Sequence, residues 1–195
     1  MKTIIGIDEV GRGPIAGPVA VGAFKINKKL NLKNIKVPLR DSKKLTRIQR
    51  EIWFEQIKVW QKEEKCDFEV TMVSAKEIDR IGIVPAIRKA LEKSLYRLTT
   101  VDYSLLILLD GGLKAPAEFK NQKTIIKGDE KESVISFASI VAKVTRDRYM
   151  FTQAKKFPGY NFETHVGYGT KAHYTAIAKN GTTNLHRQTF LKRVK

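Results

Sequence analysis

Apolar positions along the chain fall into two spacings, one typical of strands and one typical of helices. Apolar runs at 3–8, 18–26 and 105–109 predict three strands, and the alternation of polar and apolar positions at 68–72 predicts another. A fifth strand is predicted at 124–127. The run at 105–109 contains no polar residue, which is typical of a strand that is buried on both faces.

Apolar residues at intervals of three and four predict helices between and after these strands. The predicted helices begin near Thr46, Ser74, Pro85, Glu132 and Thr170. At Thr46 and Ser74 a Gln or Glu follows three residues later, which is the pattern of a capping box. Strands that alternate with helices in this order predict an α/β fold with a mixed sheet.

Charge adds an expectation about partners. The 195 residues include 37 Lys and Arg against 20 Asp and Glu, a formal net charge of +17. Segment 25–50 carries ten bases and one acid, and segment 164–195 carries six bases and no acid. This concentration favours nucleic acid over an anionic membrane, and a merely solvated surface is the alternative.

Composition limits the class of protein. Hydrophobic residues make up 42% of the chain, which suits one folded domain over 1–195 with a C-terminal helical appendage from about 160. The single cysteine, Cys66, can form neither an internal disulfide nor a cysteine zinc site, so we expect a reducing, cytoplasmic setting. No apolar run approaches the ~20 residues that cross a bilayer, so we expect no membrane association. We also expect a monomer, and no motif for a protein partner is evident.

Acidic residues follow three of the predicted strands: Asp8 and Glu9, Asp110, and Asp129. Sites in open α/β sheets form at the carboxyl ends of strands, where these side chains would converge. Carboxylates that close repel one another, and hard oxygen ligands suit Mg²⁺ or Mn²⁺. Each acid alone could instead cap a turn. Placing both Asp8 and Glu9 in one site requires the strand to end there, at the glycines that follow.

The segment 11–17 is rich in glycine but fits no standard phosphate loop. Its third glycine is one residue late for a dinucleotide fingerprint, and it lacks the Gly-Lys-Ser/Thr of a Walker A loop. It is therefore either a plain connection or a loop whose backbone approaches a ligand. A nucleotide-binding α/β enzyme and a non-catalytic basic binder both remain as alternatives.

Seven ordered segments together resemble ribonuclease HII, the type 2 ribonuclease H. These segments are 6–13 with 16–18, 41–45, 110–111, 127–129, 138–143 with 146–147, 165–170, and 186–187 with Phe190. The resemblance implies a ribonuclease H-like fold, a mixed sheet flanked by helices with a C-terminal helical extension. The related ribonuclease HIII usually has Glu at the fourth acid and a long N-terminal extension. This sequence has Asp129, and its motif begins at residue 6.

The resemblance also implies roles for single residues. Asp8, Glu9, Asp110 and Asp129 would be the catalytic metal ligands. Gly11, Arg12 and Gly13 would read the ribose 2′-hydroxyl, and Tyr168 would pack on the next deoxyribose. Ser42, Lys43 and Lys143 would hold phosphates, and the basic segments would hold the duplex.

The implied reaction is endonucleolytic cleavage, with two Mg²⁺ or Mn²⁺ ions, of the phosphodiester 5′ of a ribonucleotide. The substrates would be RNA–DNA hybrids and single ribonucleotides in duplex DNA, and the products would carry a 3′-hydroxyl and a 5′-phosphate. Such an enzyme removes ribonucleotides during DNA replication and repair. For His165, His173 and His186 we expect structural roles, and for Asp147 an ion pair in place of metal binding.

Overall fold

One mixed sheet of five strands, in the order β3-β2-β1-β4-β5, forms the centre of the protein. This computed structural model describes residues 3–32, 35–39, 42–100 and 104–191, so Asp41 of the 41–45 segment lies outside the described residues. Strand β1 pairs antiparallel with β2 and parallel with β4. The strand bounds are β1 Ile4–Val10, β2 Val19–Ile26, β3 Cys66–Val73, β4 Leu106–Asp110 and β5 Gln122–Ile125.

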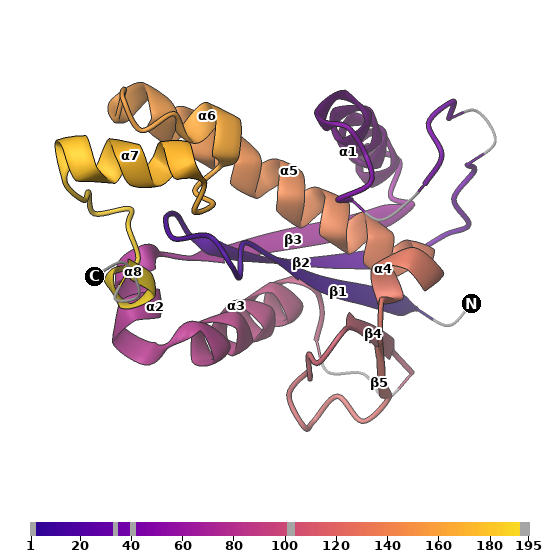
Figure 1. Cartoon of the computed structure of the whole chain (residues 1–195). Coiled ribbons are helices and arrows are strands. Elements are labelled where there is room, and N and C mark those ends of the chain that lie inside the picture. Colours follow the sequence, from indigo (N-terminus) through magenta and orange to yellow (C-terminus); the bar gives the residue numbers. More distant parts are fainter. Residues whose placement is uncertain (1–2, 33–34, 40–41, 101–103, 192–195) are drawn as a thin grey trace.

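Helices cover both faces of this sheet. Their bounds are α1 Arg47–Lys62, α2 Ala75–Ile81, α3 Ile83–Leu98, α4 Gly128–Lys131, α5 Ser133–Lys156, α6 Phe162–His165, α7 Lys171–Asn180 and α8 Gln188–Leu191. Figure 1 shows α3 on one side of the strands, α5 crossing the other side, and α6 with α7 at the far end of α5. The predicted α/β architecture and its mixed sheet are therefore confirmed.

The long helix α5 is buried on more faces than its sequence predicts. The expected stripe, which includes Phe137 and Val141, faces the sheet, but every residue from 134 to 142 is buried. The reason is that α1 packs beside α5 over the same face of the sheet, with the rings of Trp53 and Trp60 lying 5.7 and 5.8 Å from the ring of Phe137. This packing fixes α5 directly above the carboxyl end of β1.

Two local predictions differ from the structure. Strand β5 lies two residues earlier than predicted, so Asp129 belongs to the short helix α4 and does not directly follow a strand. The capping box at Ser74 is half formed: its hydroxyl accepts the Glu77 amide, but the Glu77 carboxylate pairs with Arg80 and Lys89. The box at Thr46 and Gln49 forms in full.

Within the described residues, no helix combines the length and the apolar character that a membrane crossing requires.

Candidate metal and nucleic-acid site

Three carboxylates come together where β1 and β4 reach the same edge of the sheet. Ile7 pairs with Leu109 in the parallel register, so the next residues, Asp8 and Asp110, lie side by side. Asp129 joins them from α4. Ligand oxygens of Asp8, Asp110 and Asp129 all lie within 4.8 Å of one another, and we call these residues the acidic cluster.

Glu9 lies next to the acidic cluster but outside it. β1 runs two residues beyond the predicted 3–8 and ends at Val10, directly before the glycines that were expected to end it. Because Asp8 and Glu9 both lie within the strand, their side chains point to opposite faces. The Glu9 carboxylate forms an ion pair with Arg12, N to O 3.6 Å. It still lies within electrostatic reach of the acidic cluster, since burial and then the charge of Asp110 raise the pKa of Glu9.

Burial and mutual repulsion dominate the electrostatics of the acidic cluster. Asp8 is 3% exposed, and burial raises its pKa from 3.8 to about 8, with further increases from Glu9, Asp110 and Asp129. Asp110 accepts a hydrogen bond of 2.6 Å from the Gly128 amide, which ties α4 to the end of β4. The ammonium nitrogen of Lys43 lies 4.0 Å from the carboxylate of Asp129.

This arrangement fits a divalent cation. Burial and the neighbouring acids raise the pKa of Asp8 to about 8, and the donor set consists of hard oxygens that suit Mg²⁺ or Mn²⁺. The residues that could hold such ions are the three acids of the cluster, with Glu9 beside them.

The buried hydroxyl groups of Ser139 and Ser42 form a hydrogen-bonded chain that leads from Asp8 into the interior. Ser139 on α5 hydrogen-bonds to the Asp8 carboxylate, which favours its ionised form. The Ser139 oxygen lies 2.7 Å from that of Ser42, which is fully buried. The Ser42 hydroxyl therefore faces the interior, and its predicted phosphate contact stays a prediction.

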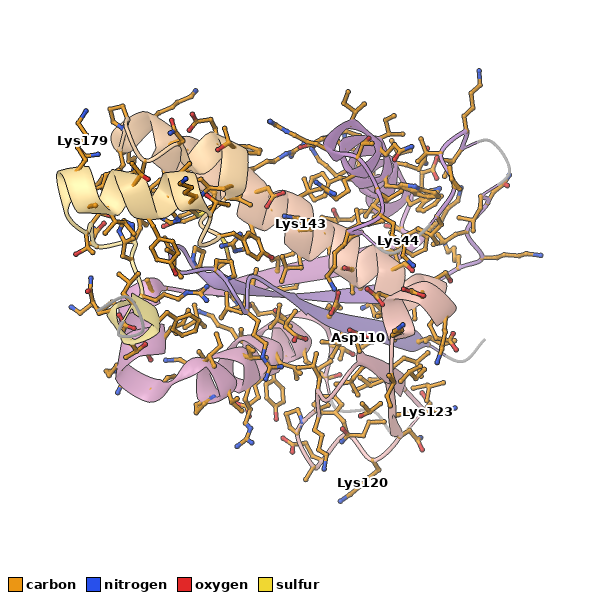
Figure 2. The ribbon with its side chains drawn as sticks, in the orientation of Figure 1. Lys44, Asp110, Lys120, Lys123, Lys143 and Lys179 are labelled. Carbon is orange, nitrogen blue, oxygen red and sulfur yellow. The ribbon has the colours of Figure 1, made fainter. Side chains whose placement is uncertain are left out.

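Lys143 on α5 is held in an ion pair. Its ammonium lies 2.8 Å from the carboxylate of Asp147, and its side chain is 14% exposed. Asp147 also lies 3.9 Å from Arg50, so the ion pair expected for Asp147 is confirmed. Figure 2 shows Lys143 and Lys44 on the same side of the molecule, with Asp110 at the carboxyl end of β4. The predicted phosphate role of Lys143 requires it to act from within this pair.

The glycine loop, residues 11–17, begins directly after β1 and lies beside Glu9. Arg12 and Gly13 are exposed, whereas Gly11 and Gly17 are buried. Two buried arginines, Arg146 on α5 and Arg187 near the C-terminus, donate hydrogen bonds to carbonyl groups of the loop and of Pro18. Burial lowers the pKa of both, that of Arg187 to about 9.

Tyr168 lies in the turn between α6 and α7, and its side chain is 43% exposed. The turn is attached to the glycine loop, because the amides of Ile15 and Ala16 both donate to the Gly167 carbonyl. The Tyr168 carbonyl is hydrogen-bonded to His173, 2.8 Å. An exposed ring on an anchored turn is free to contact a ligand.

The three histidines pack together beneath this turn. His173 and His186 lie 3.1 Å apart through their Nε2 atoms, and His165 contacts the Tyr160 carbonyl. Burial lowers the pKa of His173 to about 4 and also lowers that of His186, so the contact between these two rings suits their neutral forms. The expected structural role of the histidines agrees with these contacts.

Sequence reasoning assigned no role to Ser139, Arg146 or Arg187. Arg146 had a visible signal, since it lies four residues after Ala142 and four before Met150, on a stripe that the helix buries. The carbonyl groups that it contacts lie about 130 positions earlier in the chain, so no local pattern could identify them.

Comparison with known proteins gives concordant matches. The family model described as Ribonuclease HII matches residues 5–193. A curated protein of Endomicrobium trichonymphae, "Ribonuclease HII", is 43% identical over 188 residues, which is 96% of this chain and 84% of that protein. The chain also resembles the ribonuclease in the solved PCNA:RNase HII complex of Archaeoglobus fulgidus, with 25% identity, a TM-score of 0.73, and coverage of 95% of this chain and 93% of that one.

The same fold occurs in Bst-RNase HIII, whose structure was solved in complex with Mn²⁺. The identity is 18% and the TM-score 0.63, and the match covers 99% of this chain and 70% of that one.

Proposed function

The chain belongs to the ribonuclease HII family of metal-dependent ribonucleases, and from this premise we propose that it cuts the phosphodiester 5′ of a ribonucleotide in a DNA-containing duplex. The substrates are RNA–DNA hybrids and duplex DNA that carries a single ribonucleotide. The products carry a 3′-hydroxyl and a 5′-phosphate. In the cell this activity removes ribonucleotides from DNA in the cytoplasm during replication and repair.

The observation that carries the proposal is the acidic cluster. Three carboxylates from β1, β4 and α4 lie within 4.8 Å, and burial raises the pKa of Asp8 to about 8, so the protein maintains a repulsive arrangement that divalent cations would stabilise. In a non-catalytic nucleic-acid binder, a cluster of carboxylates would only repel the phosphates that the basic surface attracts.

Divalent ions held by Asp8, Glu9, Asp110 and Asp129 would supply activation of water and stabilisation of the leaving 3′ oxygen. The chain itself orients these ligands. Asp110 is fixed by the Gly128 amide, Asp8 by Ser139, and Asp8 also accepts a 2.7 Å hydrogen bond from the Glu9 amide. All of these residues come from one chain, so the proposal needs neither a second copy nor a protein partner for cleavage.

Specificity in this proposal comes from the glycine loop and Tyr168. The 2′-hydroxyl distinguishes RNA from DNA. Backbone groups of the loop that hydrogen-bond this hydroxyl stay unpaired when a deoxyribose takes its place, and this disfavours DNA. The exposed Tyr168 ring offers an apolar face to the next deoxyribose.

The test uses a labelled DNA duplex with one ribonucleotide, incubated with Mg²⁺ or Mn²⁺, with the ends of the products mapped. The proposal expects one cut 5′ of the ribonucleotide, leaving a 3′-hydroxyl. A matched all-DNA duplex should stay intact. If the ribonucleotide duplex also stays intact with both metals, the chain is a binder and the proposed activity is wrong.

A further inference from the structure

We propose that Arg187 and Arg146 are positioning residues, which hold the glycine loop so that its amide groups at Arg12 and Gly13 face the ribose of the substrate. This inference rests on the proposed function and adds the residues that set its ribose specificity. Neither arginine touches the acidic cluster, and both act through the loop.

Arg187 holds both ends of the glycine loop. Its guanidinium donates to the carbonyl groups of Gly11, Arg12 and Gly17, at 2.7, 3.0 and 3.0 Å. The side chain is fully buried, and in the described part of the chain it forms no ion pair within 4.0 Å. A planar guanidinium can bond several fixed carbonyls at once, which an ammonium group does less well.

Arg146 holds the end of the glycine loop and the residue that follows it. It donates to the carbonyls of Pro18 and Ala16, at 2.8 and 3.3 Å, and it is also fully buried. Its remaining amino group, Nη1, has no acceptor among the described residues. The two arginines thus hold five backbone carbonyl groups between Gly11 and Pro18.

The carbonyl contacts determine where the amides point. The described chain has no cis peptide bonds, and in a trans peptide the N–H points opposite to the C=O. Because Arg187 holds the carbonyls of Gly11 and Arg12, the amides of Arg12 and Gly13 point away from it, towards solvent. Neither amide has an internal acceptor in the part of the chain that the structure describes. The loop therefore presents two free donors beside the acidic cluster.

The glycines of the loop fit this arrangement. A Cβ on Gly11 would lie 2.2 Å from Nε of Arg146, and one on Gly17 would lie 2.4 Å from the sulfur of Met150. Both residues also have a φ of +86°. Gly13 differs, because a Cβ there would meet nothing within 4 Å. The buried glycines make room for Arg146 and its neighbours, and the exposed glycine leaves open space in front of the amides.

The test compares Arg187→Lys with wild type in two measurements. Cleavage efficiency (kcat/KM) is measured on the duplex with one ribonucleotide, and the Kd on the matched all-DNA duplex in Mg²⁺. Lysine keeps the charge, but its single nitrogen cannot reach three carbonyls that three separate guanidinium nitrogens contact, so we expect cleavage to fall about 100-fold, as a small misplacement can cause. The Kd for all-DNA duplex should stay within about twofold, because phosphate contacts do not depend on the loop. Hydrogen exchange of the Ile15, Ala16 and Gly17 amides, which are hydrogen-bonded in the intact loop, should become faster.

Ile57→Ala on α1 serves as the matched control. Ile57 is fully buried in the core beneath α1, so its truncation destabilises the fold without touching the glycine loop. We expect a lower Tm but an unchanged ratio of ribonucleotide cleavage to DNA binding. Arg146→Lys repeats the test if Arg187→Lys does not fold.

Gly13→Ala tests the open face of the loop. It should fold with an unchanged Tm and still lose cleavage, because its methyl group occupies the space in front of the amides. The positioning role is wrong if the arginine variants lose cleavage and all-DNA binding by the same factor, or if they keep wild-type cleavage. Failure of the proposed function would look different, since the wild-type protein would then cut nothing.

Discussion

Asp8 shows how single residues build this protein's chemistry. Its place at the end of an apolar strand is visible in the sequence, as is that of Asp110, and the parallel pairing of β1 with β4 then brings them together. The hydrogen bond from Ser139 is not visible, because Ser139 lies on a helix whose packing against β1 is set by tertiary contacts. Local patterns therefore identify the acids but not the groups that orient them.

The raised pKa of Asp8 predicts how the stability of the metal-free protein depends on pH. Asp8 titrates near pH 8 when folded and near 3.8 when unfolded, so between these values the folded state binds the extra proton. Its contribution to stability is full below the unfolded pKa and is lost as pH rises through the folded pKa. We expect this group to lower the Tm in EDTA as the pH rises from about 4 to about 8, and to change it little above about pH 9.

Asp8→Asn is the control, since it cannot titrate and can still accept the Glu9 amide. Its Tm should fall less over the same range. Mn²⁺ should raise the wild-type Tm more at the higher pH, because metal ligands must be deprotonated. An equal pH dependence in wild type and Asp8→Asn would show that Asp8 is not the titrating group.

At the scale of elements, α5 connects the core to the site. Its sequence predicts one apolar stripe, yet it is buried on nearly all sides over its first half because α1 covers it. Local spacing reports which face of a helix is apolar and cannot report a neighbouring helix that packs against another face. The predicted position of β5 is wrong by two residues because β5 is an edge strand that begins with polar Gln122 and exposed Lys123. These two positions give no apolar signal in the sequence.

Phe137 is the packing centre of this element. It is 1% exposed and contacts the rings of Phe24, Trp53 and Trp60. Phe137→Ala should lower the free energy of unfolding by about 3–5 kcal/mol, measured by urea denaturation. Phe151→Ala on the same helix, at a partly exposed ring, should cost less than half as much. Equal losses would mean that Phe137 does not hold α1 and α5 together.

The turn between α6 and α7 should affect one substrate more than another. Tyr168→Ala removes the apolar face but leaves the anchor to His173, which uses only the backbone carbonyl. We expect cleavage at a single ribonucleotide to fall more than cleavage of a long RNA–DNA hybrid, while Tyr168→Phe should retain both. Kinetics on the two duplexes measures this, and equal losses would contradict a role in reading the junction.

Over the whole molecule, the net charge of +17 surrounds a buried negative site. Exposed lysines lie on many elements; Figure 2 shows Lys120 and Lys123 around β5 and Lys179 on α7, with Lys44 on the side of Lys143. The sequence predicts the sign of the partner from this excess of bases. It does not predict which lysines form ion pairs within the protein. The pair of Lys143 with Asp147, for example, also includes Arg50 from another helix.

The salt dependence of duplex binding should separate these lysines. Lys43 is 75% exposed, so Lys43→Gln should reduce the slope of log Kd against log salt by about 0.9, one phosphate contact. Lys143→Gln should change the slope less, since Asp147 already neutralises Lys143. Lys89→Gln on α3, across the sheet from α5, should leave the slope unchanged. A larger effect at Lys89 than at Lys43 would show that the duplex binds the face that carries α3, which would contradict this account.

The central claim is that the acidic cluster holds the ions that cut the substrate. The most direct measurement compares wild type with Asp110→Asn on a duplex carrying one ribonucleotide, in Mg²⁺, at protein concentrations that saturate binding. Asparagine can still accept the Gly128 amide, so the fold and the binding of DNA should persist, while cleavage should fall by at least about 100-fold. Cleavage by Asp110→Asn at the wild-type rate would show that the acidic cluster is not the catalytic site.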